Sequence, residues 1–224
     1  MTREQYQDDL DDLGDDVFAM GELVLERLDE SLTALRTGDG DRGRTVAEGD
    51  LAVNERYLAL ESRCIDLFAL QQPVAGDLRF VAASFKILTD LERIGDLAAN
   101  LGQYAAATTD ELSPGVSVAD VGSLARSLVR RSLDAYADRD AVACRAIHAD
   151  DDEVDALCAR GSEAVARDLI EREAASDAWE LEGLLGQVST LLLTFRDLER
   201  IADHAVNVAA RTLYLTESDP ELIY

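Results

Sequence analysis

Apolar residues recur at intervals of three and four through most of the chain, the spacing that places them on one face of an α-helix. Leu13, Val17, Met20, Val24 and Leu28 follow this pattern in the first stretch. The pattern predicts six helices, separated by glycine- and proline-rich stops. Their expected ranges are residues 2–36, 45–70, 77–107, 118–138, 140–173 and, capped by Ser176 or Asp177, a last helix to 215.

The clearest interruption is the stretch TTDELSPGVS, where Pro114 and Gly115 stand together. Three long helices are expected on either side of it. One amphipathic helix is unstable alone, whereas three antiparallel helices bury a shared apolar seam. We therefore expect an all-α protein of two tandem three-helix bundles related by internal duplication, residues 1–110 and 111–224.

One heptapeptide occurs in both halves. Residues 90–96 read DLERIGD and residues 197–203 read DLERIAD, so the copies differ only at Gly95 and Ala202. Matched copies at equivalent points of two halves indicate a duplication. The two small residues are consistent with close approach of a neighbouring helix or a ligand. The apolar seams predicted around the copies are Ile87, Leu91, Ile94, Ala98 and Leu101, and Leu198, Ile201, Ala205 and Val208.

The chain is strongly acidic. It has 46 acidic residues against 21 basic ones, a formal net charge of −25, and Lys86 is its single lysine. Such a surface repels phosphate backbones, which argues against nucleic-acid binding. Self-repulsion is screened at molar salt, where the Debye length is about 3 Å. We interpret the composition as adaptation to a salt-rich cytoplasm, with a melting temperature that rises with KCl; the alternative is an acidic protein from an ordinary organism.

The sequence also bears on location. Cys64, Cys144 and Cys158 lie in helical patterns without a CxxC array, and are expected to be reduced, apolar packing residues. No uncharged apolar run is long enough to span a membrane, and the N-terminus lacks the basic start and apolar stretch of a signal peptide. We expect a cytoplasmic protein without membrane insertion.

Oxygen-bearing side chains form a stripe on each heptapeptide helix, because residues four apart lie nearly above one another. The stripes are Glu92, Asp96 and Asn100, and Glu199, Asp203 and Asn207. Asp90 and Asp197 fall on another face. We interpret them first as partners of Arg93 and Arg200 three residues on, and only second as ligands. Those arginines are adjacent in sequence to the stripe and are expected to be poor partners for its carboxylates.

The middle helices supply facing groups at the same spacing. These are Asp50 with Asn54 in the first half and Asp151 with Asp155 in the second. An antiparallel bundle brings them near the heptapeptide stripes, and all-oxygen sets suit hard cations such as Mg²⁺, Ca²⁺, Mn²⁺ or iron rather than zinc. The spacing leaves two interpretations open, a metal site in each half or a solvated acidic face. The matched placement in both halves strengthens the first.

Other chemistry finds little support. His148 and His204 are the only histidines, and neither has a counterpart in the other half. His204, next to Asp203, is either a further ligand or, as is more usual for the residue type, a surface or half-buried side chain. The Glu-xx-His pairs of di-iron bundles, a Walker-type loop and a GxSxG motif are all missing, which disfavours ferritin-like redox, nucleotide and hydrolase chemistry.

Two stretches carry a family resemblance. ALQQPVAGDLRFVAASFKILTDLERIGDLAANL at 69–101 resembles the signature region of the PhoU family, and LLLTFRDLERIADHAVNVAARTLYL at 191–215 resembles its second copy. The resemblance implies metal clusters bound on two three-helix bundles through E(D)xxxD motifs. Iron and zinc are associated with the family, and magnesium and manganese are further candidates. The motifs fall here on Glu92, Asp96, Glu199 and Asp203, with Asp50, Asn54, Asp151 and Asp155 on the middle helices. Asn54 replaces an acid of the pattern, which makes the first site less negative.

The resemblance also implies a function. PhoU proteins are cytoplasmic negative regulators that help to repress phosphate-starvation genes and restrain phosphate uptake. They act by contact with the phosphate ABC transporter, through its ATPase subunit, and/or with a sensor kinase, and a homodimer is among the assemblies allowed. We expect no catalytic residues and no enzyme activity. The alternatives are a carboxylate-based, metal-dependent phosphohydrolase and a metal-storage or structural bundle.

Overall fold

The computed structural model describes residues 2–49, 51–70, 75–107, 116–173 and 178–223, and within them the chain is built from α-helices alone. The side chains of residues 70, 107, 172, 173 and 178–181 also lie outside the described part. The helices are α1 (Arg3–Thr37), α2 (Gly40–Glu48), α3 (Leu51–Leu70), α4 (Ala75–Ala107), α5 (Val118–Asp138), α6 (Ala141–Glu173) and α7 (Ala178–Glu217). The predicted all-α class is confirmed.

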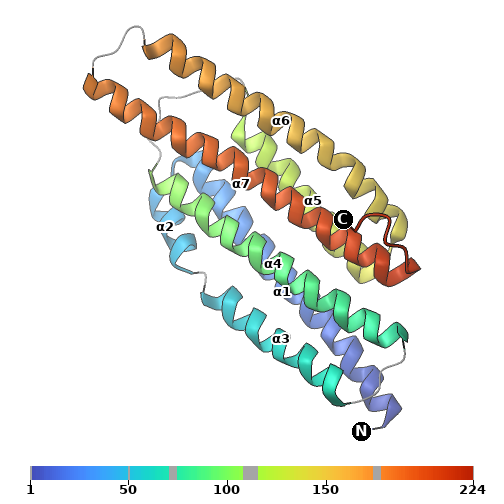
Figure 1. Ribbon diagram of the computed structural model, residues 1–224. Helices are drawn as coiled ribbons and strands as arrows, with labels where there is room; N and C mark the ends of the chain where they lie inside the picture. The colour runs from blue at the N-terminus through green and yellow to red at the C-terminus, as the bar shows by residue number, and fades with distance from the viewer. Residues whose placement is uncertain (1, 50, 71–74, 108–115, 174–177, 224) are drawn as a thin grey trace.

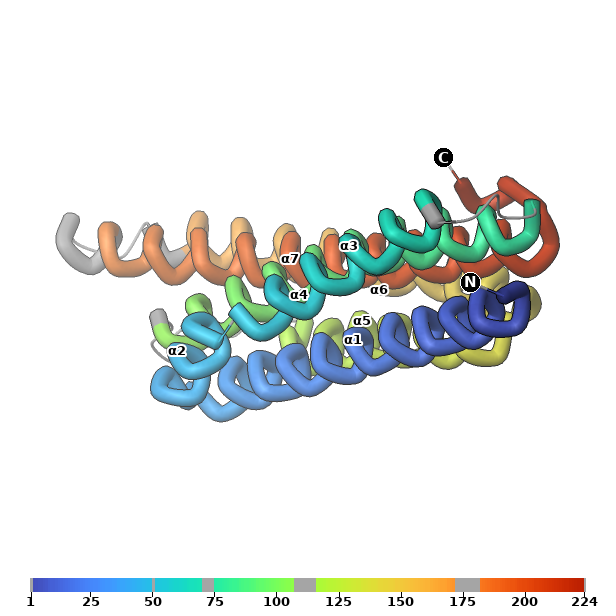
Figure 2. Tube along the Cα trace, turned by 90° about the horizontal axis from the view of Figure 1, so that it is seen from below, coloured from blue at the N-terminus to red at the C-terminus, as the bar shows by residue number. Residues whose placement is uncertain are grey.

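The helices form two bundles that pack against each other. α1, α2, α3 and α4 make the first, and α5, α6 and α7 the second. In Figure 1, α4 and α7 run side by side through the middle of the molecule, with α3 outside α4 and α6 outside α7. Figure 2 shows α1 and α5 together in a second layer beneath them. The predicted tandem arrangement of two bundles is therefore confirmed.

An approximate two-fold relation between the halves is visible in the contact of α1 with α5. A Cβ on Gly21 would collide with the side chain of Leu133, and a Cβ on Gly122 would collide with Leu32. Each glycine thus accommodates a leucine of the opposite half, in reciprocal fashion. The missing side chains let the two long helices approach closely while the leucines fill the space between them.

The core is continuous across both halves. All nine predicted seam residues, from Ile87 to Val208, are buried and belong to one apolar cluster. Between α6 and α7 a large residue meets a glycine: Phe195 fills the space beside Gly161, where a Cβ would lie 2.5 Å from the Phe195 ring. Burial of these seams, more than helix propensity, stabilises helices of this length.

The predicted second helix, 45–70, is wrong in one respect, because the structure divides it into α2 and α3. α2 lies directly against the backbone of α4, and a Cβ on Gly102 would sit 2.6 Å from the Gly43 carbonyl oxygen. Gly49 ends α2 and donates its N–H to the Val46 carbonyl at 3.1 Å. The glycines of TGDGDRG, expected to form a stop, end α1 at Gly38 and then begin α2.

Other predicted boundaries fare differently. The third helix was expected to begin at Asp77, with that residue as its N-cap, but α4 already begins at Ala75 and Asp77 lies in its first turn. Asp140 does cap its helix: its Oδ1 accepts from the N–H groups of Val142 and Ala143 at 2.9 and 3.0 Å. The Ser176 or Asp177 cap and the boundary between residues 110 and 111 lie outside the described residues.

Two further expectations concern the cysteines and the possibility of a membrane span. Cys64, Cys144 and Cys158 are buried and unpaired, as predicted, and burial raises the pKa of each thiol. Among the described helices, none combines the length and the apolar character needed to cross a membrane.

Candidate metal centre

The second half gathers three carboxylates at one point between α6 and α7. Asp151 and Asp155 lie one turn apart on α6, and Asp203 faces them from α7. Each contributes an oxygen that lies within 4.8 Å of the oxygens of the other two. We refer to Asp151, Asp155 and Asp203 as the carboxylate trio. Like charges at this separation repel one another, and a bound cation relieves that repulsion.

The electrostatic effect of this arrangement is seen most clearly in the pKa of Asp151. Burial raises the pKa of its carboxyl to about 7, and the charges of Asp155 and Asp203 add to the effect. Its Oδ1 is buried and has no hydrogen-bond partner among the described residues. A buried acceptor without a partner costs free energy, so the site favours a proton or a metal ion at this atom.

Glu199 stands one turn before Asp203 on the same face of α7. It lies outside the trio, yet its negative charge contributes to the raised pKa of Asp151. Its own pKa is raised by burial and then by Asp155 and Asp203. The Cys158 thiol nearby has a pKa of about 12, through burial and the charge of Glu199. A neutral thiol is a poor ligand, which leaves an all-oxygen donor set.

The first half is arranged differently. Glu92 and Asp96 lie on α4, and Asn54 on α3, while Asp50 lies outside the described residues. Arg93 approaches both acids, with its Nε 3.5 Å from Glu92 and its Nη1 3.6 Å from Asp96. The expectation that Arg93 is a poor partner for the stripe is therefore wrong, because its long side chain folds back along the helix surface.

The predicted partners of Asp90 and Asp197 are also wrong. Asp90 lies across the contact between α4 and α7, with its Oδ1 2.9 Å from His204 Nδ1 and 3.3 Å from Asn207 Nδ2. His204 is thus half-buried, and its Nδ1 is directed at Asp90. Sequence periodicity misses this pairing because it describes faces of one helix and not the helix that covers them.

Asp197 makes the reciprocal contact. It is fully buried and accepts hydrogen bonds from Asn100 at 3.3 Å, from the Tyr104 hydroxyl at 2.8 Å, and from the neighbouring Arg196 at 2.8 and 3.0 Å. Burial and this bond raise the pKa of Tyr104 to about 12. Asn100 and Asn207 therefore join the two halves and do not extend the stripes. An asparagine follows each aspartate by ten residues in the sequence, but this spacing does not show that each aspartate pairs with the asparagine of the other half.

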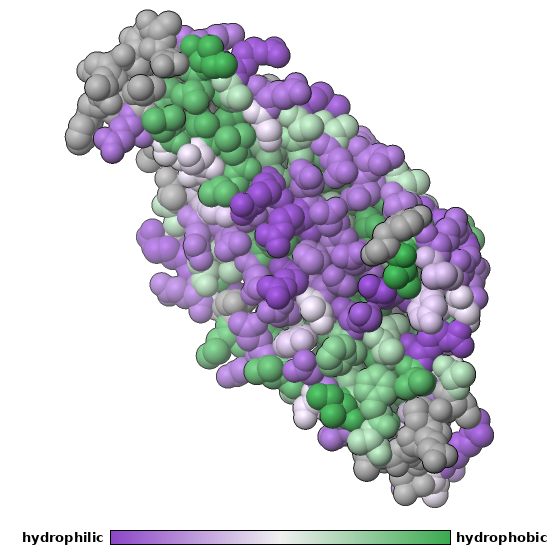
Figure 3. Space-filling view, viewed as in Figure 1, coloured by the Kyte–Doolittle hydropathy of each residue, from purple (hydrophilic) through white to green (hydrophobic). Residues whose placement is uncertain are grey.

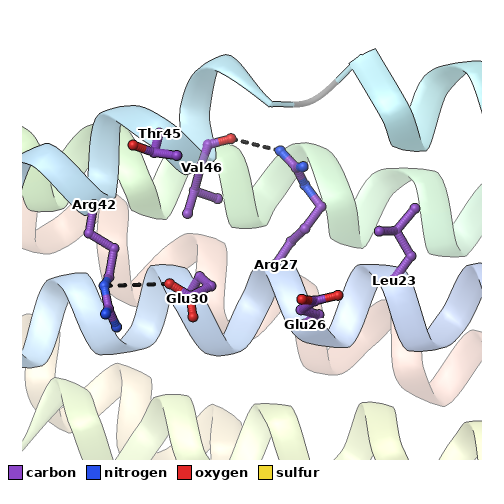
Figure 4. Close-up of a pocket in the computed structure, with 7 residues that line it drawn as sticks. All are labelled: Leu23, Glu26, Arg27, Glu30, Arg42, Thr45 and Val46. Atoms are coloured by element: carbon purple, nitrogen blue, oxygen red, sulfur yellow. Dashed lines mark hydrogen bonds and ion pairs between the residues drawn. The ribbon is translucent and has the colours of Figure 1, made fainter.

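A surface pocket of about 450 Å³ lies apart from both stripes, between α1 and α2. Figure 4 shows its lining residues, which are Leu23, Glu26, Arg27, Glu30, Arg42, Thr45 and Val46. Arg42 Nε lies 3.4 Å from Glu30, and Arg27 donates to the Val46 carbonyl at 2.7 Å. These arginines thus fasten α2 to α1, and Arg27 sits at the carbonyl end of α2, where a positive charge is stabilising.

Known proteins share the sequence pattern and the fold of this chain. The chain is 30% identical over 209 residues to the phosphate-specific transport system accessory protein PhoU homolog 1 of Methanothermobacter thermautotrophicus, covering 92% of this chain and 91% of that protein. The Escherichia coli accessory protein PhoU is 29% identical over 94% of this chain and 84% of its own length. The crystal structure of PhoU from Pseudomonas aeruginosa has a TM-score of 0.85 at 28% identity, over 96% of this chain and 100% of that one.

The family model named PhoU domain matches the chain twice, over residues 17–105 and 118–212. Each match contains one copy of the heptapeptide and the helix that faces it. The reciprocal contacts of α4 with α7 and of α1 with α5 are what a duplicated domain of this kind produces. The chain belongs to the PhoU family.

Proposed function

We propose that this chain is a metal-binding accessory regulator of phosphate transport, acting in the cytoplasm by contact with other proteins. Family membership over both halves supports the regulatory role, because the relatives are named accessory proteins of a phosphate-specific transport system. The carboxylate trio is the single observation that supports metal binding.

The residues present fit a hard cation. The donor set is all oxygen, and the buried Asp151 Oδ1 lacks a partner among the described residues. Asp151, Asp155 and Asp203 would hold the ion, with Glu199 one turn away on α7. A bound cation would offset the mutual repulsion of these carboxylates, which come from α6 and α7. Magnesium, manganese and iron match these donors better than zinc.

The first half is a second, weaker candidate. Glu92 and Asp96 lie on α4, which packs against α3, and Asn54 of α3 stands at the position that Asp155 occupies in the second half. Arg93 already offsets part of the negative charge there. We therefore propose a lower affinity for cations at this site than at the trio.

The regulatory role is non-enzymatic in this proposal, and its partners are the ATPase subunit of a phosphate transporter and/or a sensor kinase. Deletion in the native host is expected to raise phosphate uptake and starvation-gene expression under phosphate-replete conditions. Unchanged uptake and expression would contradict the proposal. A phosphoester panel with Mn²⁺ or Mg²⁺ tests the alternative, since turnover above the metal blank would indicate a phosphohydrolase.

The contribution of the metal is tested separately, by complementing the deletion with the double variant Asp155→Asn and Asp203→Asn. We expect loss of bound metal and incomplete restoration of regulation. Glu163→Gln is the matched control, because Glu163 is exposed on the same helix and is not among the charges that act on Asp151. Full regulation by a metal-free double variant would assign the metal to storage or structure.

A further inference from the structure

Three large apolar side chains stand on the outer face of α3. Leu51, Leu58 and Ile65 are 68%, 60% and 55% exposed, and they lie seven residues apart. On an α-helix this spacing places them in one row, which we call the α3 stripe. Figure 3 shows apolar groups reaching the surface along α3, between hydrophilic ones. The residues that attach α3 to the bundle, Val53 and Leu60, occupy the opposite side of the helix.

The fold does not require this row. Val53 and Val154 are buried at equivalent positions of α3 and α6, which places the two helices in register. In that register the positions of the α3 stripe correspond to Asp152, Ala159 and Ala166, all three exposed. At these three positions the second half therefore has small or charged residues on the same architecture. Other large apolar side chains are exposed as well, among them Val142 and Ile170. The three of the α3 stripe differ in forming one row at heptad spacing, and such a row indicates a surface that is covered by a partner.

The charges around the α3 stripe are acidic. Glu55 and Asp66 are exposed on one side of it, and Glu61 is half-buried on the other. The two arginines of α3 are turned away from the stripe, because Arg56 and Arg63 both bind Asp16 of α1 at 2.5 Å. The stripe is thus an apolar row with negative flanks.

These charges decide between a second copy of the chain and a different partner. An antiparallel pair of α3 helices centred on Leu58 would place Leu51 beside Ile65 of the second copy. It would also place Glu55 beside Glu61 of the second copy, twice over by symmetry. Like charges opposite one another destabilise a helix pair, and the net charge of −25 adds repulsion between copies. A helix with basic flanks has the complementary pattern.

We propose that the α3 stripe is the docking site for an amphipathic helix of a partner protein, with apolar residues at heptad spacing and arginine or lysine on either side. This inference rests on the proposed function in one point only, namely that the partner is a protein whose activity the chain regulates. The apolar row supplies burial, and the acidic flanks set the choice and orientation of the helix. The two halves are then specialised, the first for docking and the second for the metal.

The test is site-specific photo-crosslinking of the full chain in its native host. The photoreactive residue p-benzoylphenylalanine replaces Leu58 in one variant and the equivalent Ala159 in a control. We expect crosslinking from position 58 to a helical segment of another protein that has the apolar and basic pattern. Adding Leu51→Gln and Ile65→Gln should reduce the yield at least fivefold, while Ala159→Gln and Ala166→Gln should leave it unchanged.

Other results would overturn the proposal. These are no product from position 58, a product with α3 of a second copy, a product with an acidic or irregular segment, or equal yields from positions 58 and 159. A charge variant, Glu55→Lys with Asp66→Lys, is expected to lower the crosslinking yield as well. An unchanged yield would contradict a partner helix with basic flanks. The substituted side chains are exposed, and circular dichroism verifies that each variant retains its helices.

The proposed function is judged independently. If deletion changes phosphate uptake but the triple variant Leu51→Gln, Leu58→Gln and Ile65→Gln restores it fully, the regulatory role stands and the docking site fails. If deletion has no effect on uptake while the crosslink appears as described, the docking site stands and the role in phosphate regulation fails.

Discussion

The two halves share an architecture but differ in how their outer helices are made. α6 is one continuous helix of 33 residues, and two of its aspartates meet Asp203 of α7. Its counterpart in the first half is divided into α2 and α3, and α2 is drawn against the backbone of α4 where Gly43 and Gly102 touch. Duplication preserved the arrangement of helices, while single residues at the contacts changed what each half presents.

The charges of the two halves diverge in the same way. In the second half the trio is crowded, and the pKa of Asp151 is raised to about 7. In the first half Asn54 stands where the second has Asp155, and Arg93 lies against Glu92 and Asp96. A duplicated motif therefore predicts equivalent positions without predicting equal affinity, because neighbouring residues set the charge of each site.

The largest expected difference concerns the reciprocal aspartates between α4 and α7. Asp197→Ala should lower the free energy of unfolding by about 3 kcal/mol, because it leaves the Tyr104 hydroxyl and Asn100 without their buried acceptor. Asp90→Ala should cost about 1 kcal/mol, since Asp90 is partly exposed and its partners can bind water. Urea denaturation measures both values, and equal costs would contradict the asymmetry.

The next effect is on metal affinity. Asp203→Asn should weaken Mn²⁺ binding by at least about tenfold, because it removes one of three carboxylates that offer ligand atoms at the trio. Isothermal titration calorimetry measures the change. Asp96→Asn in the first half is the matched comparison and should alter the tightest binding site little. A larger loss from Asp96→Asn would reverse the assignment of the stronger site.

A smaller effect is expected on the pH dependence of stability. The folded state raises the pKa of the Asp151 carboxyl, so the stability that this group contributes is present at low pH and is lost as pH rises from about 4 towards 7. In the metal-free protein Asp151→Asn should therefore be stabilising at pH 8 by on the order of 1 kcal/mol, after allowance for solvent screening.

Thermal unfolding in the presence of a chelator measures the Asp151→Asn effect, which corresponds to about 2–4 °C at this chain length. The difference should shrink as pH falls towards 4. Added Mn²⁺ should reverse the order at pH 8, since the wild-type trio gains stability from the ion. A variant that is less stable than wild type at pH 8 without metal would show that Asp151 is favourably ionised there.

The smallest expected effect is a gain in the first half. Asn54→Asp combined with Arg93→Gln should raise the affinity of the Glu92 and Asp96 site for Mn²⁺ by a few-fold, because it adds a carboxylate and removes a competing cation. Competition with a fluorescent chelator detects the added binding. Arg200→Gln is the matched control in the second half, and an equal gain there would assign the effect to net charge alone.

Much of the fold followed from periodicity, because burial of an apolar seam leaves a 3.6-residue signature in the sequence. The seams around both heptapeptides were predicted correctly. The close approach of a neighbouring helix at Gly95 is also confirmed, because a Cβ there would lie 3.0 Å from the side chain of Val53 on α3. The pairing of middle-helix and heptapeptide acids in the second half also followed, since spacing of four defines a face and antiparallel packing defines what it meets.

The remaining features depend on contacts between residues distant in sequence. The contact of Arg93 with Asp96 is an i,i+3 pair that local spacing allows, but nothing in the local pattern says that Asp90 and Asp197 cross to the opposite half. Those outcomes depend on where α4 crosses α7 and on which face each helix turns towards the other. Asn54 in place of an acid was visible in the sequence. The sequence did not show that, among the described residues, the first half lacks a group of three carboxylates close enough to share a cation.

The sequence by itself determined the helical class, the duplication, the apolar seams and the carboxylate stripes, because each of these is set by spacing along one helix. The tertiary structure alone decided three things: the break between α2 and α3, the exchange of aspartate and asparagine between the halves, and the isolation of the α3 stripe at the surface. Each depends on distances between helices, which are set by the joint packing of all the side chains between them.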